Sequence, residues 1–94
     1  MRDPYNGGDM KKTGEDRYRP GTLAYSLRGR DAGRVYVIVR QDKEYVWAAD
    51  GKKRPLSAPK RKNIKHLQKI NRSVDLAQAD DTVIIQAIDD YLRR

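Results

Sequence analysis

The chain has 94 residues, of which 37% are hydrophobic, a net charge of +8, and no cysteine. A chain of this length builds one small domain, and the lack of cysteine excludes a disulfide framework, a thiolate metal site and a cysteine nucleophile. The longest apolar runs have five residues, as in Val35 to Val39, so we expect no membrane span, no signal-peptide core and a cytoplasmic location.

Residues 1–20 are rich in glycine, proline and charge and have hardly any aliphatic side chains. Such a segment cannot bury enough apolar surface to offset the entropy lost on ordering. We therefore expect a disordered N-terminal tail over residues 1–20 and a folded domain from Gly21 onward.

Three segments after Gly21 have the pattern of β-strands. Leu23, Tyr25 and Leu27 alternate with smaller residues, which is the period of a half-buried strand. Residues 34–40 are mostly β-branched or aromatic and form the strongest predicted strand, although both of its faces are apolar and the pattern leaves open which one meets the core. Residues 45–50 form a third strand that ends at a hairpin signal, Asp-Gly.

Two further strands are predicted less directly. Residues 52–58 could form a fourth strand, which Pro55 would confine to a sheet edge or a bulge. Residues 63–68 could close the sheet as a short fifth strand. Together, four or five short strands joined by tight turns predict a small SH3-like β-barrel over residues 21–70, because closing the sheet removes exposed edges.

A helix is predicted over residues 81–92, after a linker at residues 71–80. Ile84, Ile88 and Leu92 recur at helical spacing, and Asp80 is a suitable N-cap. The predicted fold class is therefore mainly all-β, with one C-terminal α-helix packed on the barrel.

The basic excess lies in the middle of the chain. Residues 21–72 carry fourteen basic and four acidic groups, a net charge of +10, whereas residues 73–94 carry two basic and five acidic groups, a net charge of −3. A surplus of this size favours a polyanionic partner, and nucleic acid comes first. Membrane binding is disfavoured because the one amphipathic helix is acidic.

No constellation for catalysis is recognisable. His66 is the only histidine, and no nucleophile-elbow sequence surrounds any serine, so a surface or partly buried structural role explains it better. The glycine-containing segment at residues 28–33 lacks the ending of a phosphate-binding loop and joins two strands. We predict a protein that is not an enzyme and needs no cofactor and no metal.

The segment from Leu23 to Val39 resembles a KOW motif, with Gly33 at the hallmark glycine. The continuation through residues 45–51 and 59–67 is also similar to KOW-type large-subunit ribosomal proteins of archaea and eukaryotes and to their small bacterial relatives. The resemblance covers about residues 21–70. It implies an SH3-like barrel that binds structured RNA, with ribosomal RNA as the expected target and the loop at residues 28–34 approaching the RNA.

The predicted RNA contacts are basic side chains and two loop glycines, because guanidinium and ammonium groups neutralise phosphate and glycine allows close backbone approach. They are Arg28, Gly29, Arg30, Gly33, Arg34, Lys52, Lys53, Arg54, Lys60, Arg61, Lys62 and Lys65. Tyr25, Tyr36, Tyr45 and Trp47 could stack on unpaired bases, although a core position is the better expectation for them. We expect a monomer when free. The alternative is a protein-interaction module that docks on a ribosomal or polymerase protein through the barrel or the acidic helix.

Overall fold

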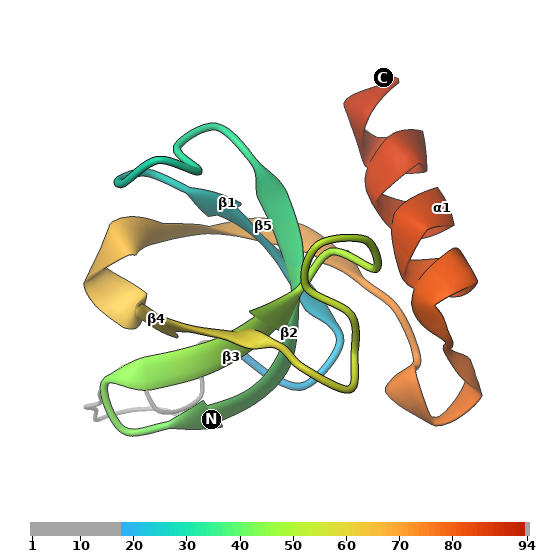
Figure 1. Cartoon of the computed structure of the whole chain (residues 1–94), viewed down its shortest axis with the longest axis horizontal. Coiled ribbons are helices and arrows are strands. Elements are labelled where there is room, and N and C mark those ends of the chain that lie inside the picture. Colours follow the sequence, from blue (N-terminus) through green and yellow to red (C-terminus); the bar gives the residue numbers. More distant parts are fainter. Residues whose placement is uncertain (1–17, 94) are drawn as a thin grey trace, which may run out of the picture.

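The structure is a computed structural model that describes residues 18–93. Five strands and one helix make up its regular structure (Figure 1). In chain order they are β1 (Thr22–Ser26), β2 (Val35–Asp42), β3 (Tyr45–Ala49), β4 (Lys60–Asn63), β5 (Leu67–Ser73) and α1 (Asp81–Leu92). The mainly β fold with a C-terminal helix is confirmed.

The strands form one antiparallel sheet in the order β4-β3-β2-β1-β5. A 3-10 turn at Ile64–His66 joins the two edge strands, β4 and β5, and the sheet curls so that these strands face one another across the interior (Figure 1). The arrangement is that of a small SH3-like barrel.

Strand β2 resolves the question of which face meets the core, because both faces are buried. Tyr36 and Ile38 lie in the barrel interior together with Val46 and Ala48 of β3. The opposite face of β2 packs under α1, where Val35 and Val37 lie in a second cluster. Strand β2 is therefore apolar on both faces because it lies between two hydrophobic clusters.

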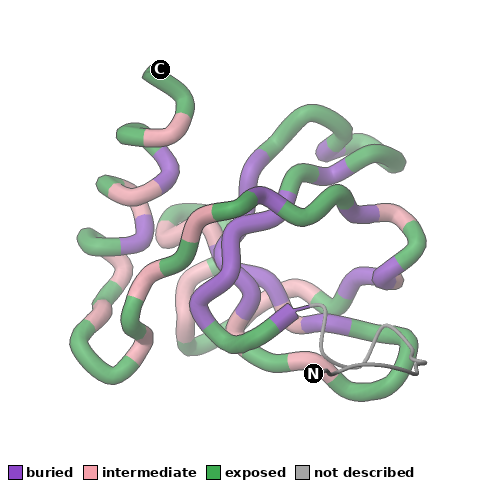
Figure 2. The backbone as a smooth tube through the Cα atoms, turned by 180° about the vertical axis from the view of Figure 1, so that it is seen from behind, coloured by how far each residue is buried: buried purple, intermediate pink, exposed green. Residues whose placement is uncertain are grey.

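Helix α1 has the predicted bounds and docks through the predicted side. Ile84 and Ile88 are buried against the second cluster, and the solvent side of the helix is exposed (Figure 2). The Asp80 carboxylate caps the helix by accepting a hydrogen bond from the Val83 N–H at 2.9 Å. Asp81 accepts one from the Leu56 N–H at 2.8 Å, which fixes the β3–β4 loop (residues 50–59) to the helix.

Several sequence predictions are corrected. Residues 52–58 form no strand but a series of bends and turns, since Pro55 has no N–H to donate and the Asp50 carboxylate holds the N–H groups of Lys52 and Arg54, each at 2.9 Å. Residues 63–68 are not one strand either. Asn63 ends β4, and its side chain accepts from the Lys65 N–H to begin the 3-10 turn.

The predicted domain boundaries also shift. Residues 71–80 are not simply a linker, because β5 continues to Ser73 and a 3-10 helix spans Leu76–Gln78. Tyr18 is only 2% exposed and lies in the barrel interior, so the folded part begins before Gly21. The rest of the predicted tail, residues 1–17, lies outside the described residues.

The alternation in β1 is present, but the small residues face the barrel interior. Ala24 and Ser26 are fully buried, whereas Tyr25 and Leu27 are exposed and Leu23 is covered by the second cluster. Strand β1 lies between β2 and β5 and pairs with both of them, so its small side chains are covered on the interior face.

Candidate nucleic-acid interface

The β1–β2 loop (residues 27–34) has a defined backbone. Gly29 and Gly33 have φ values of +88° and +90°, a backbone conformation that residues with a side chain rarely adopt. The Gly33 N–H donates to the Ser26 carbonyl at 2.8 Å and the Arg34 N–H donates to the Asp31 carbonyl at 3.0 Å. These hydrogen bonds define the backbone conformation of the loop and so fix the positions from which its arginine side chains project.

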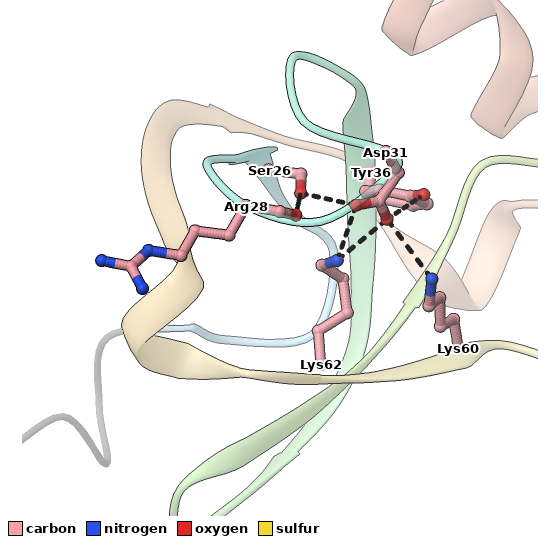
Figure 3. A network of polar contacts seen from close by, with 6 residues as sticks. All are labelled: Ser26, Arg28, Asp31, Tyr36, Lys60 and Lys62. Atoms are coloured by element: carbon pink, nitrogen blue, oxygen red, sulfur yellow. Dashed lines mark hydrogen bonds and ion pairs between the residues drawn. The ribbon is translucent and has the colours of Figure 1, made fainter.

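Asp31 fastens this loop to β4 across the barrel mouth (Figure 3). Its carboxylate accepts hydrogen bonds from the Lys62 ammonium at 2.8 and 3.1 Å, from the Tyr36 hydroxyl at 2.7 Å and from the Ser26 hydroxyl at 2.9 Å. The Lys60 ammonium lies 3.6 Å from the same carboxylate. Asp31, Lys62 and Ser26 are all buried, so this cluster is part of the folded structure.

The cluster fixes the charge of its members. Burial alone raises the pKa of Asp31, but hydrogen bonds from Lys62, Tyr36 and Ser26 outweigh it and hold the pKa well below its usual range. Burial and the hydrogen bond to Asp31 raise the pKa of Tyr36 well above its usual value. At neutral pH the cluster therefore contains an ionised Asp31 and a neutral Tyr36.

A shallow pocket of about 160 Å³ opens beside Asp31, and basic side chains from three segments of the chain line it. They are Arg30 and Arg34 from the β1–β2 loop, Lys53 and Arg54 from the β3–β4 loop, and Lys60 from β4. The other lining residues are Asp31, Tyr36 and Asp50. We call this the basic pocket.

The two carboxylates of the basic pocket are already engaged. Asp31 is held by Lys62, and Asp50 accepts two backbone N–H groups of its own loop. Among the described residues, the only ion pairs are those of Asp31 with Lys60 and Lys62. The guanidinium groups of Arg30, Arg34 and Arg54 consequently keep their donors available for an anion.

The structure divides the predicted contacts of β4 between two faces. Successive strand residues point to opposite sides, so Lys60 and Lys62 point toward Asp31 (Figure 3). Arg61 lies on the other face of β4, over the Tyr45 ring. Lys62 is only 9% exposed and bonded to Asp31. Its predicted phosphate contact is therefore replaced by a structural role.

The remaining predicted contacts lie outside the basic pocket. The Arg28 side chain points away from the Asp31 cluster (Figure 3). Lys65 is exposed on the 3-10 turn between β4 and β5. Lys52 is exposed beside α1, where it lines a second cavity of about 280 Å³ with Gly33, Ile85 and Leu92.

Sequence reasoning missed two residues. The sequence did not indicate a role for Asp31, because this residue lies inside a basic loop and its partner, Lys62, is 31 residues away. Arg40 was passed over because it ends a strand that was considered only for its core. In the structure the Arg40 guanidinium lies 3.9 Å from the centre of the Trp47 ring. An isolated acidic residue between two glycines and three arginines was the one available signal for Asp31.

No protein-family model and no curated protein shows significant similarity to the chain. The resemblance to KOW proteins thus remains a prediction from the residues quoted above. Over the described residues, no helix is long and apolar enough to cross a membrane, and no group of three potential metal ligands occurs.

Proposed function

We propose that the protein binds structured RNA through the basic pocket, without catalysis, and that its target is ribosomal RNA on cytoplasmic ribosomes. One observation carries the proposal: five basic side chains from three separate segments converge on one pocket, where Lys62 and backbone N–H groups already engage the two carboxylates. The choice of ribosomal RNA rests on the resemblance to KOW-type ribosomal proteins.

The proposed mechanism is neutralisation of phosphates at fixed positions. Arginine binds a phosphate through two parallel N–H donors, and the pocket volume is about five times the roughly 30 Å³ that one water occupies in the liquid, which leaves room for a phosphate group. A rigid loop recognises the spacing of phosphates in a folded RNA. Shape is therefore read in preference to base edges, as is usual for double-stranded RNA.

The test measures affinity for a blunt RNA hairpin as a function of salt. With about five phosphate contacts, log affinity should fall with log salt at a slope of about −3 to −5. Replacing Arg30, Arg34 and Arg54 together with glutamine should reduce that slope by about 2 to 3 units. A matched triple variant, Lys69→Gln, Arg72→Gln and Arg93→Gln, removes the same charge elsewhere and should change the slope far less.

Equal effects of the two triple variants would show that net charge, and not the pocket, holds the RNA. Crosslinking in cells with sequencing of the attached RNA tests the target. Enrichment of one ribosomal RNA helix supports it, and an absence of RNA above background refutes the whole proposal.

The alternative of a protein-interaction module is favoured by one feature of α1. Leu92 is 59% exposed at the end of the helix, next to the exposed carboxylates of Asp89 and Asp90. An exposed leucine among acidic groups suits a basic protein partner. Loss of a captured ribosomal or polymerase protein on Leu92→Gln, with RNA binding absent, would support this function instead.

A further inference from the structure

The outer face of strands β2, β3 and β4 carries a row of aromatic rings and guanidinium groups. Val46 and Ala48 of β3 face the barrel interior, so Tyr45 and Trp47 face outward. Trp47 pairs directly with Arg40 of β2 on one side and with Arg61 of β4 on the other. An irregularity in β2 between Ile38 and Arg40 shifts the register and brings Arg40 opposite Trp47.

The rings and guanidinium groups in this row are stacked. The Arg40 guanidinium carbon lies 3.9 Å from the centre of the Trp47 ring, and that of Arg61 lies 4.5 Å from the centre of the Tyr45 ring. By comparison, the Arg72 guanidinium carbon lies 5.8 Å from the Tyr91 ring. Cation–π attraction at the shorter distances holds each guanidinium group over its ring.

The row is open to solvent. Arg40 and Arg61 are exposed, and Tyr45 is 37% exposed. Neither arginine forms an ion pair with a carboxylate of the described residues. Each guanidinium therefore lies over a ring and belongs to an exposed residue, and no described carboxylate forms an ion pair with it.

We propose that Arg40, Tyr45, Trp47 and Arg61 form a stacking platform for unpaired bases of a single-stranded RNA segment. Bases stack on aromatic rings and on guanidinium planes alike, and the free N–H donors suit the phosphates between them. The inference rests on the proposed function and extends it, because it adds a single-stranded element to the structured RNA.

The placement of charge limits where phosphates lie on the platform. Asp42 and Glu44 lie at the β2–β3 turn beside Tyr45 and repel phosphate. Arg61 lies over Tyr45 on the opposite face of β4 from Lys60, which lines the basic pocket. Phosphates of a bound single strand are therefore favoured at the guanidinium groups of Arg40 and Arg61 and disfavoured at the turn.

Trp47 is the only tryptophan of the chain, so its fluorescence reports on the platform alone. The full chain is titrated with short oligoadenylate and with an abasic strand of the same length, which has the same phosphates and no bases. Oligoadenylate should quench the Trp47 emission and bind at least about fivefold more tightly than the abasic strand, as expected for one stacked base. The blunt hairpin serves as the probe for the basic pocket.

A ring-deleted variant separates stacking from charge. The double substitution Tyr45→Thr and Trp47→Thr keeps both arginines and should bring oligoadenylate affinity, followed by anisotropy of a labelled strand, down to that of the abasic strand. Tyr25→Thr is the matched control, because Tyr25 is an outward tyrosine of β1 with similar exposure, 39%, and should leave the affinity unchanged.

Two results overturn the platform. If wild-type protein binds both strands equally and its Trp47 emission does not change, bases do not stack there, and this measurement does not depend on whether the variant folds. Hairpin binding with the steep salt slope would then still support the proposed function. If neither strand nor the hairpin binds, the proposed function fails and the platform fails with it.

Discussion

Replacement of Lys62 by methionine tests whether this residue belongs to the fold or to the RNA contact surface. Methionine has a side chain of similar length and lacks the ammonium group that bonds to Asp31 at 2.8 and 3.1 Å. Asp31 is then left buried and ionised, with the hydroxyls of Tyr36 and Ser26 and the more distant Lys60 as its remaining partners.

The size of the effect follows from these contacts. Removing one partner of a buried ion pair costs about 3–5 kcal/mol, chiefly because a charge is left uncompensated. Lys60 at 3.6 Å and the two hydroxyls offset part of that cost, so we expect a loss of about 2–4 kcal/mol in the free energy of unfolding. With a denaturant slope of about 1 kcal/mol per molar urea, the urea midpoint falls by about 2–4 M.

Urea unfolding followed by Trp47 fluorescence and circular dichroism measures this. Lys60→Met is the matched control, since its ammonium is half exposed and farther from Asp31, and it should cost less than about 1 kcal/mol. The double variant Asp31→Asn, Lys62→Met should be more stable than the sum of the two single losses predicts, because neither charge is left alone. An unchanged midpoint for Lys62→Met would refute the structural role of the Asp31 cluster.

Three other predictions concern stability. Replacing Ile88 with alanine should cost about 2–5 kcal/mol because its side chain is buried between α1 and the sheet, and an unchanged urea midpoint would mean that the helix does not dock. The Gly51→Ala substitution should lower the free energy of unfolding by more than the roughly 1–2 kcal/mol that a strained φ costs, because a Cβ at this position would lie 2.6 Å from the Asp81 carbonyl oxygen. A nuclear magnetic resonance spectrum in which the α1 signals do not move would contradict this prediction. Because the pKa of Asp31 is depressed in the folded state, its contribution is present above about pH 4 and is lost as the pH falls below that value. The urea midpoint should therefore drop in acid, and Asp31→Asn should lack part of that drop; identical acid profiles would argue against the Asp31 cluster.

The elements that local chemistry specifies were predictable from the sequence. Helix α1 has the predicted bounds because an N-cap carboxylate and isoleucines at helical spacing act within one turn or two of the chain. Strands β1, β2 and β3 lie within one or two residues of their predicted positions, since β-branched and aromatic residues favour extended backbone there. The segment at residues 52–58 was mispredicted because the side-chain turn at Asp50 outweighed its weak strand pattern.

The candidate site was predictable only in composition. The surplus of basic residues between residues 21 and 72 is visible in the sequence, and the structure gathers Arg30, Arg34, Lys53, Arg54 and Lys60 from it. Which neighbours within a basic run share a face depends on whether that run is a strand. Since Lys60 to Lys62 belong to β4, Arg61 points away from its two neighbours.

By itself, the sequence determined the class of fold, the helix and the sign of the surface charge, because each depends on residues close together in the chain. Only the tertiary structure decided that β2 is buried on both faces, that Lys62 pairs with Asp31, and that Arg40 and Arg61 flank Trp47. These contacts join residues from separate strands, and their register is set by the closure of the sheet and by an irregularity in β2 that no local pattern encodes.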